Sequence, residues 1–144
     1  MEKYLEFFRE NDHFARHCGI ELLQVTPGAA RVRMPVRDFH LNGAGTVHGG
    51  ALFTLADFAF AVAVNSRGKL ALAINTSMSF INPAFAGTLY AQAQEISSNR
   101  RLGVYQVEIE DEQGQLVARF EGTAYRKDKP LLKDSDGQIV ANKV

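Results

Sequence analysis

The chain has 144 residues, of which 46% are hydrophobic and 22% charged, and this composition is typical of one globular domain with a single core. Sixteen basic residues balance sixteen acidic ones without forming a stripe, which excludes the electrostatic signature of binding to nucleic acid or to anionic membranes. We therefore expect neither nucleic acid nor a membrane as a partner.

The cysteine and histidine content excludes further classes. Cys18 is the only cysteine, so no internal disulfide can form, and residues 1–6 lack the basic and then apolar layout of a secretory signal. We expect a cytoplasmic protein. His13 and His17 do not have the spacing of a metal site, and Cys18 has no recognisable base, so no metal is expected.

The first elements of the chain are helices and a hairpin. Residues 1–18 place apolar side chains at the spacing of one or two short amphipathic helices, which we expect to cover an apolar surface. Residues 20–25 and 30–36 flank a Pro-Gly turn, and the second of these segments alternates apolar with polar side chains, which predicts a β-hairpin with one buried face. Residues 37–50 are loop by composition.

The next segment, residues 51–64, is apolar on nearly every side and long enough for about four turns of helix. It is too short to span the roughly 30 Å of a hydrocarbon core. Asp57 within it would add roughly 2.5 to 3.5 kcal/mol at mid-membrane. We therefore predict a buried helix that other structure wraps, rather than a membrane anchor.

Four strands are predicted after this helix, over residues 70–80, 88–96, 103–110 and 115–125. In the first strand, the alternate side chains from Leu70 to Phe80 are expected on one face. Tight turns between consecutive strands favour an antiparallel sheet. An antiparallel sheet wrapped around one long central apolar helix is an α+β fold.

The domain boundaries follow from the same pattern. We predict a single domain over residues 1–126, with residues 1–18 as its N-terminal helical cover, and a polar C-terminal tail over residues 127–144. A sheet that wraps one side of a helix leaves an outer face and an edge exposed. We therefore expect a homo-oligomer that covers them.

Asp57 is the only charged side chain between His48 and Arg67. A carboxylate removed from water without a cation costs several kcal/mol or has a raised pKa, so an isolated one indicates function. A structural carboxylate, hydrogen-bonded to backbone groups or to an arginine distant in the sequence, is the alternative.

Gly49 and Gly50 stand at the start of the predicted helix. The first N–H groups of a helix have no internal partner and can stabilise an oxygen that gains negative charge in acyl transfer, although a tight turn is the alternative reason for two glycines. Gly49 and Asp57 are eight residues apart. This is about 12 Å along one helix, so an antiparallel partner helix is needed to bring Asp57 of one subunit beside Gly49 of the other.

A longer signature runs from the loop into the helix, with the pattern Asn42-x-x-Gly45-x-x-His48-Gly49-Gly50-x-x-x-x-Leu55-Ala56-Asp57. It continues in the strands with Phe80-x-x-Pro83, Gly103-x-Tyr105-x-Val107-Glu108-Ile109 and Val117-Ala118-x-Phe120-x-Gly122. Over roughly residues 15–126, the chain therefore resembles the hotdog-fold acyl-CoA thioesterases, in particular the phenylacetate-degradation subfamily.

The resemblance implies that Asp57 is the catalytic carboxylate, either as general base on a water or as nucleophile on the thioester. It also implies that the Gly49 N–H binds the thioester oxygen and that Asn42 helps to place substrate or water, although Asn42 is equally suited to closing a turn. In this family the two groups come from different subunits of a dimer, often within a tetramer. Coenzyme A is then part of the substrate, and no cofactor is expected.

Further residues are candidates for contact with the substrate. His48 could shuttle a proton, but a histidine ahead of a helix more often fixes the loop by hydrogen bonding. Gly50, like Gly49, stands at the start of the predicted helix and is a further candidate for contact with the substrate. Three polar residues interrupt the first strand after the helix, namely Asn75, Thr76 and Ser77. Their side chains could reach the active site of the neighbouring subunit, or they could hydrogen-bond to one another.

Basic and aromatic side chains each allow two interpretations. Basic residues near strand ends could pair with coenzyme A phosphates or be simply solvated, and they are Arg100, Arg101, Arg126 and Lys127. Some phenylalanines could line an acyl pocket, although aromatic residues are first of all core material; these are Phe53, Phe58, Phe60 and Phe80.

We predict an acyl-CoA thioesterase that releases a free carboxylic acid and coenzyme A. The resemblance favours aromatic acyl groups such as phenylacetyl or hydroxyphenylacetyl, followed by medium-chain groups. A non-catalytic acyl-CoA-binding or sensing protein on the same fold is one alternative, because fold does not fix function. An acyl thioester hydratase or dehydratase is the other, although such enzymes usually pair a histidine with a carboxylate in a different motif.

Overall fold

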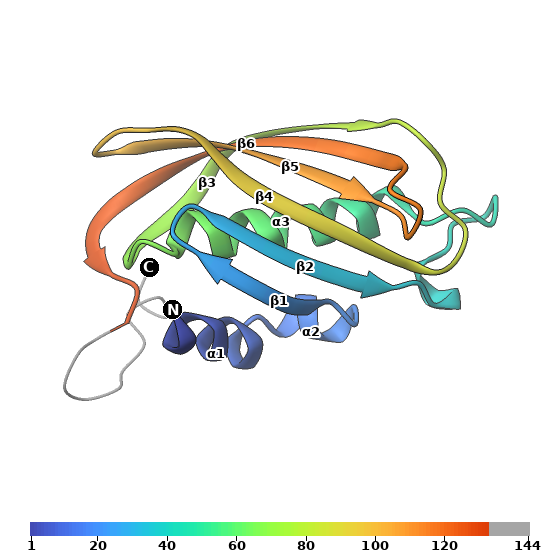
Figure 1. The fold of residues 1–144 in the computed structure, drawn as a ribbon, viewed down its shortest axis with the longest axis horizontal. Helices are drawn as coiled ribbons and strands as arrows, with labels where there is room; N and C mark the ends of the chain where they lie inside the picture. Colours follow the sequence, from blue (N-terminus) through green and yellow to red (C-terminus); the bar gives the residue numbers. More distant parts are fainter. Residues whose placement is uncertain (133–144) are drawn as a thin grey trace.

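The computed structural model describes residues 1–132 of the chain. A six-stranded sheet in the order β1-β2-β4-β5-β6-β3 curls around one long helix, α3 (Gly49–Asn65), while α1 (Glu2–Asn11) and α2 (His13–His17) lie below β1 (Figure 1). Every neighbouring pair of strands is antiparallel. The predicted α+β arrangement, an antiparallel sheet around one long helix, is confirmed.

The strands follow the predicted order, with one short helix in the loop that precedes α3. They are β1 (Glu21–Thr26), β2 (Ala29–Pro35), β3 (Lys69–Phe80), β4 (Thr88–Ser98), β5 (Leu102–Glu110) and β6 (Leu116–Pro130), and the short helix is η1 (Asp38–His40). β6 continues four residues past the boundary predicted at 126, and Leu131 is buried in the core. The rest of the predicted tail, residues 133–144, lies outside the described residues.

The core lies between α3 and the concave face of the sheet, because α3 is apolar on almost all sides. Phe60 on α3 packs against Tyr105 of β5 and Phe120 of β6, with ring centroids 5.9 and 5.4 Å apart. Burying each such side chain contributes about 1.5 to 3 kcal/mol. Gly122 makes this contact possible, because a Cβ there would lie 2.8 Å from the Phe60 ring.

The long strand β3 does not keep a single apolar face. Leu72 pairs with Tyr125, which is 39% exposed on the outer surface, whereas the Phe80 ring lies against Gly49 on the helix side. The register with β6 shifts between Ala73 and Asn75, and such a bulge reverses the alternation of side chains. The prediction that alternate residues from 70 to 80 share one face is therefore wrong.

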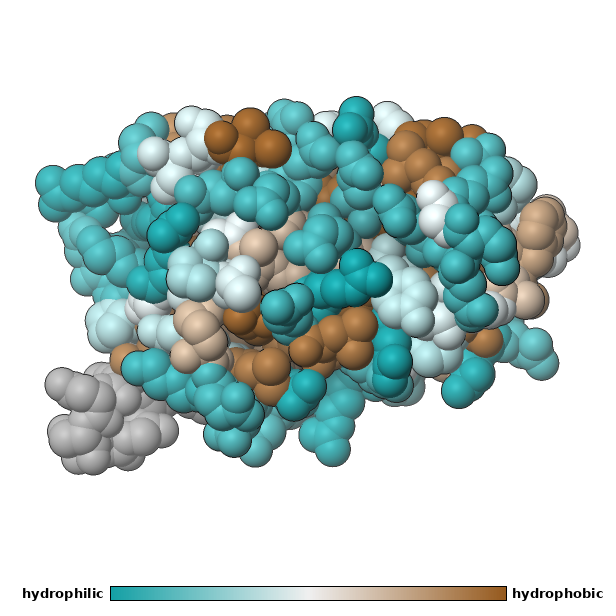
Figure 2. Space-filling view, in the orientation of Figure 1, coloured by the Kyte–Doolittle hydropathy of each residue, from teal (hydrophilic) through white to brown (hydrophobic). Residues whose placement is uncertain are grey.

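The two edges of the sheet differ. At β1, the Arg9 guanidinium donates to the Leu22 carbonyl (2.6 Å), so the N-terminal helices cover part of that edge. Figure 2 shows that this face of the molecule is mainly hydrophilic, with apolar side chains gathered between β1 and α1. At the other edge, the outer side of β3 pairs with no strand of residues 1–132, and Ile74 and Phe80 are 60% and 59% exposed. An uncovered apolar edge strand favours pairing with another chain.

Candidate active site

The amino end of α3 presents an unused hydrogen-bond donor. His48 is the N-cap of the helix, and its Nδ1 accepts the Gly50 N–H (2.8 Å). Among residues 1–132, the Gly49 N–H has no acceptor. Because the helix dipole adds partial positive charge there, the Gly49 N–H is suited to hold an oxygen that gains negative charge.

Asn42 closes the loop ahead of this helix. Its Oδ1 accepts the N–H groups of Ala44 (3.0 Å) and Thr46 (3.1 Å), and its Nδ2 donates to the Thr46 hydroxyl (2.9 Å). These bonds place Asn42 close to Gly49 but use most of its polar atoms within the loop. A contact with substrate would have to use the hydrogen-bonding capacity of the Asn42 amide that these three bonds leave open.

A hollow of about 320 Å³ opens beside Gly49. It is bounded by the loop after β3 and by the start of α3, and its lining is Asn42, Thr46, Val47, Gly49, Leu52, Phe80, Ile81, Asn82, Pro83 and Ala84. A side chain at Gly49 would place its Cβ 3.3 Å from the Phe80 ring, so glycine keeps the donor accessible. Leu52 and Phe80 make one wall apolar, as binding an acyl chain or a pantetheine arm requires.

Asp57 lies two turns further along α3 and is half-buried. Burial raises the pKa of its carboxyl, and the like charge of Asp12 on the N-terminal cover raises this pKa further. Within the described part of the chain, no cation or hydrogen-bond donor lowers it. The structural alternative of a carboxylate held by backbone groups or an arginine therefore finds no support among residues 1–132.

Asp57 belongs to a narrow accessible stripe on α3. Beyond the first turn of the helix, the residues that are not buried are Phe53, Thr54, Asp57 and Ala61. Their spacing of three and four places them on one face. Gly49 and Asp57 are both accessible, but the length of helix between them separates the two groups by about 12 Å within one chain.

The polar group on β3 lies at the bare edge of the sheet. Asn75, Thr76 and Ser77 pair through their backbones with Thr123, Gly122 and Glu121 of β6, and their other side faces no strand of residues 1–132. The structure thus brings Asn42, His48, Gly49 and Gly50 together at one end of α3. It leaves Asp57 two turns further along α3 and the polar group of β3 at the edge of the sheet.

The phenylalanines divide by exposure. Phe58 and Phe60 are core residues at 4% and 1% exposure, whereas Phe53 and Phe80 are accessible at 37% and 59%. Among the basic residues, Arg126 is 6% exposed and donates to the carbonyls of Asn99 and Leu102, so it holds a turn rather than facing solvent.

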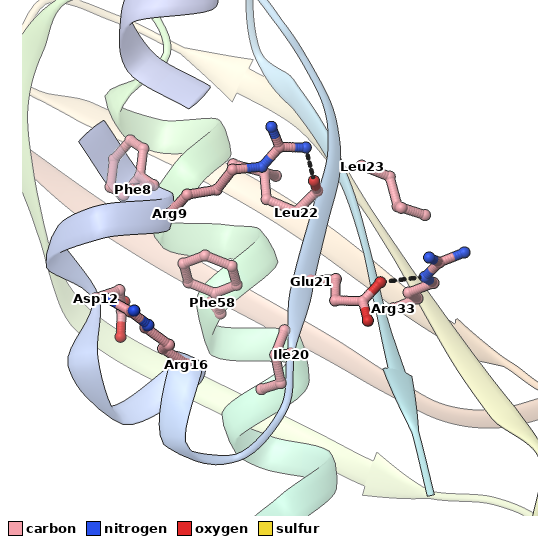
Figure 3. A pocket seen from close by; sticks show the side chains of 10 residues that line it. All are labelled: Phe8, Arg9, Asp12, Arg16, Ile20, Glu21, Leu22, Leu23, Arg33 and Phe58. Atoms are coloured by element: carbon pink, nitrogen blue, oxygen red, sulfur yellow. Dashed lines mark hydrogen bonds and ion pairs between the residues drawn. The ribbon is translucent and has the colours of Figure 1, made fainter. Parts of the chain in front are cut away.

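A second hollow, of about 330 Å³, lies between the N-terminal helices and β1 (Figure 3). Phe8, Ile20 and Phe58 form its apolar floor, while Arg9, Asp12, Arg16, Glu21 and Arg33 stand around it. Phe58 follows Asp57 in the chain, so this hollow lies next to the helix segment that carries the carboxylate.

Residues 1–132 contain no group of three or more Cys, His, Asp or Glu side chains arranged to hold a metal ion. No helix among them is long and apolar enough to cross a membrane.

Sequence reasoning missed three contributors to this region. Asp12, the N-cap of α2, acts on Asp57 from 45 positions earlier, and Thr46 and Asn82 join the Gly49 hollow from two different loops. An Asn-Pro pair after β3 was a usable signal for the second loop. The effect of Asp12 had no signal in the sequence, because only the fold brings α2 onto α3.

Comparison with known proteins identifies the family. Residues 44–118 match the model of the thioesterase superfamily. The chain is 44% identical to the acyl-coenzyme A thioesterase PaaI of Escherichia coli over 118 residues, which is 81% of this chain and 84% of that protein. It is 27% identical to acyl-coenzyme A thioesterase 13 of Pongo abelii over 78% of this chain and 84% of that one.

Solved structures agree with the sequence comparison. The E. coli PaaI protein from the phenylacetic acid degradation operon superposes with a TM-score of 0.86 at 40% identity, covering 89% of this chain and 94% of that one. The TT0310 protein of Thermus thermophilus gives a TM-score of 0.78 at 44% identity, covering 81% and 99%. The predicted hotdog fold is confirmed.

Proposed function

The chain belongs to the thioesterase superfamily, and we propose that it hydrolyses acyl-coenzyme A thioesters at sites shared between two subunits. It is an acyl-CoA thioesterase, and hence a thioester hydrolase. The observation that carries the shared site is the separation of Gly49 and Asp57 along one accessible face of α3.

The chemistry follows from the two groups. The Gly49 N–H donates to the thioester carbonyl oxygen as the negative charge on that oxygen grows, with the helix dipole behind it. Asp57 then acts either as general base, taking a proton from water as that water attacks the carbonyl carbon, or as nucleophile on the same carbon. In the general-base route, the attack of water breaks the C–S bond, coenzyme A leaves as its thiol and the free acid is released. In the nucleophilic route, breaking the C–S bond releases coenzyme A and leaves an acyl anhydride on Asp57, and a water then hydrolyses this anhydride to release the acid and regenerate the carboxylate.

Two surfaces support a two-fold dimer. The accessible stripe of α3 is flat enough for a second helix because its members include only one large side chain, Phe53. The neighbouring edge of β3, which pairs with no strand among the described residues, offers backbone groups together with the exposed Ile74. Antiparallel pairing of α3 with its copy brings each Asp57 to the other subunit's Gly49. A dimer of dimers is compatible with the same site.

The position of the two-fold axis of the proposed dimer indicates which part of the partner subunit would contact coenzyme A. The Asn65 side chain bonds to Ala71 at one end of α3, and Phe80 contacts Gly49 at the other, so β3 runs antiparallel to the helix. An axis midway between Gly49 and Asp57 crosses α3 near Phe53 and β3 at about Ser77. The start of the partner's β3 then lies beside the rim of the Gly49 hollow.

That end of the partner subunit is basic. Seven of the sixteen Lys and Arg residues belong to it, namely Arg67, Lys69, Arg100, Arg101, Arg126, Lys127 and Lys129. The acidic residues that pair with them among the described residues are Glu95 and Asp128. The remaining positive charge is suited to the phosphates of coenzyme A, and Arg100 is well exposed there, with 76% of its side chain accessible.

The acyl group is proposed from the relatives. Because the E. coli protein comes from a phenylacetic acid degradation operon, phenylacetyl and hydroxyphenylacetyl groups are the first substrates to test. Phe53 and Phe80, which are accessible near Gly49 or the α3 stripe, provide aromatic contact area for such a ring.

The test is a panel of aromatic and medium-chain acyl-CoAs incubated with the purified protein and a thiol reagent. Rapid release of free thiol, lost in Asp57→Asn, supports the proposal. Tight binding without thiol release would indicate the sensing alternative. Addition of water across an acyl double bond, with the thioester intact, would indicate the hydratase.

A further inference from the structure

His40 is a buried polar residue without a role in the scheme above. It lies in η1, is 3% exposed, and has a backbone partner at each ring nitrogen. The Arg37 N–H donates to Nδ1 (2.9 Å), so Nδ1 carries no proton, and Nε2 donates to the Cys18 carbonyl (2.7 Å). The imidazole is thus an acceptor on one side and a donor on the other.

The backbone of the same residue reaches the candidate oxyanion donor. The His40 carbonyl accepts the His48 N–H (2.7 Å), and His48 both precedes Gly49 and caps α3. The Phe39 ring packs against the imidazole at a tilt of 52°, with centroids 4.2 Å apart. A ring held at both nitrogens therefore fixes the residue that comes directly before Gly49.

The other end of this connection is the N-terminal cover. Cys18 follows α2 directly, so the Nε2 bond ties the end of α2 to the loop. The start of α2 is capped by Asp12, whose carboxylate accepts the Ala15 N–H (3.1 Å) and raises the pKa of Asp57. One short helix is thus connected with both halves of the site.

We propose that His40 is a positioning residue for thioester hydrolysis, which holds the Gly49 N–H in place by joining its loop to the end of α2. The proposal rests on the proposed function, because it assigns no chemistry to His40 itself. A donor held in place before the reaction contributes more in the transition state than in the bound substrate, so its displacement lowers kcat more than it changes KM.

Two substitutions separate the hydrogen bonds from the packing. His40→Leu fills a similar volume but makes neither bond, whereas the His40→Gln amide offers an oxygen to the Arg37 N–H and an N–H to the Cys18 carbonyl. We expect kcat to fall roughly tenfold to a hundredfold in His40→Leu, with KM for the acyl-CoA changed less than about threefold. His40→Gln should recover most of kcat.

The matched control is Asn65→Leu at the opposite end of α3. Asn65 is equally buried, at 5% exposure, and its side chain likewise satisfies backbone groups, of Ala61 and Ala71. Its loss should lower the melting temperature as much as His40→Leu does while kcat per folded enzyme stays at the wild-type value. If His40→Leu does not fold, His40→Asn, which cannot reach both partners, is measured under the same criteria.

A kcat of His40→Leu within about twofold of wild type would overturn the proposal, as would an equal loss of kcat in Asn65→Leu. Failure of His40→Gln to recover more activity than His40→Leu would also count against it. A wild-type protein that releases no thiol from any acyl-CoA would instead remove the proposed function, and this inference with it.

Discussion

Asp57 and Glu95 are two carboxylates in partly buried settings, and their surroundings are opposite. Glu95 pairs with Arg67 (3.0 Å) and with the buried Arg126 (4.0 Å), and it accepts a hydrogen bond from the Tyr105 hydroxyl (2.7 Å). The Arg67 hydrogen bond is the main cause that lowers the pKa of Glu95. Asp57 has no such partners among residues 1–132, and burial raises its pKa.

The difference shows how the chain uses its charges. At the carboxyl end of α3, every buried polar side chain of the described residues has a partner, so the charges there stabilise the fold. On α3, the Asp57 carboxylate and the Gly49 N–H stay unpaired in the part of the chain that the structure describes. This costs stability but leaves both groups free to bind substrate.

The largest effect on activity is expected from Asp57→Asn, which removes the base or nucleophile but keeps the size and shape of the side chain. We expect kcat to fall about 10²- to 10⁴-fold, measured by thiol release. The melting temperature should be equal to or higher than that of wild type, because a carboxylate without a partner is removed. A variant with near wild-type kcat would contradict the assignment of Asp57.

Glu95→Gln should show the reverse. It leaves Arg126 buried without its countercharge, so the free energy of unfolding should fall by about 1 to 3 kcal/mol in urea denaturation, while kcat per folded enzyme is unchanged. The control is Glu108→Gln, which breaks the exposed pair with Arg119. That change should cost less than about 1 kcal/mol. Equal losses in the two variants would show that the Glu95 network is no more than a surface pair.

Substrates of different charge can test the basic residues that surround the carboxyl end of α3. Arg100→Glu combined with Arg101→Glu should raise KM for an acyl-CoA about tenfold, because charge facing the phosphates is reversed. KM for the matching acyl-pantetheine thioester, which lacks the nucleotide phosphates, should stay the same. Arg119→Glu on the outer face of the sheet is the control. A rise in KM for both thioesters would argue against phosphate recognition.

Smaller effects of opposite sign are expected in the dependence of stability on pH. The pKa of Asp57 is raised in the folded state, so its ionisation opposes folding, and the wild type should lose stability relative to Asp57→Asn as pH rises above the usual aspartate range. The pKa of Glu95 is lowered, so its contribution is present above the usual glutamate pKa and is lost as pH falls through the folded-state pKa.

Urea denaturation of Asp57→Asn, Glu95→Gln and wild type between pH 3 and about 7 measures how the free energy of unfolding of each depends on pH. The same shift in Asp57 predicts that the acid limb of kcat/KM lies above the pH at which an ordinary aspartate titrates. Stability differences that change in the same direction for both variants would contradict the two environments.

The sequence was most informative where the signal is local. Asp57 stands alone in an apolar segment, and Gly49 directly precedes that segment, so both could be found without a structure. The curled sheet followed from the need to cover a helix that is apolar on all sides.

What the sequence could not supply depends on contacts between distant residues. The arginine partners of Glu95 lie 28 and 31 residues from it, and the His40 ring bonds to Cys18, 22 residues earlier. The bulge in β3 has no Gly or Pro to mark it, so the reversal of faces between Leu72 and Phe80 was not predictable from alternation alone.

A mixed oligomer tests most directly whether two subunits share one site. Asp57→Asn and Gly49→Val, whose side chain would press on the Phe80 ring, are each expected to be inactive as pure oligomers. Co-expressed with different tags and purified over both, they should form dimers in which one site combines an intact Gly49 with an intact Asp57. The predicted thiol-release activity is about half that of wild type per dimer. Mixed oligomers as inactive as the pure variants, with wild-type assembly, would show that each site lies within one chain.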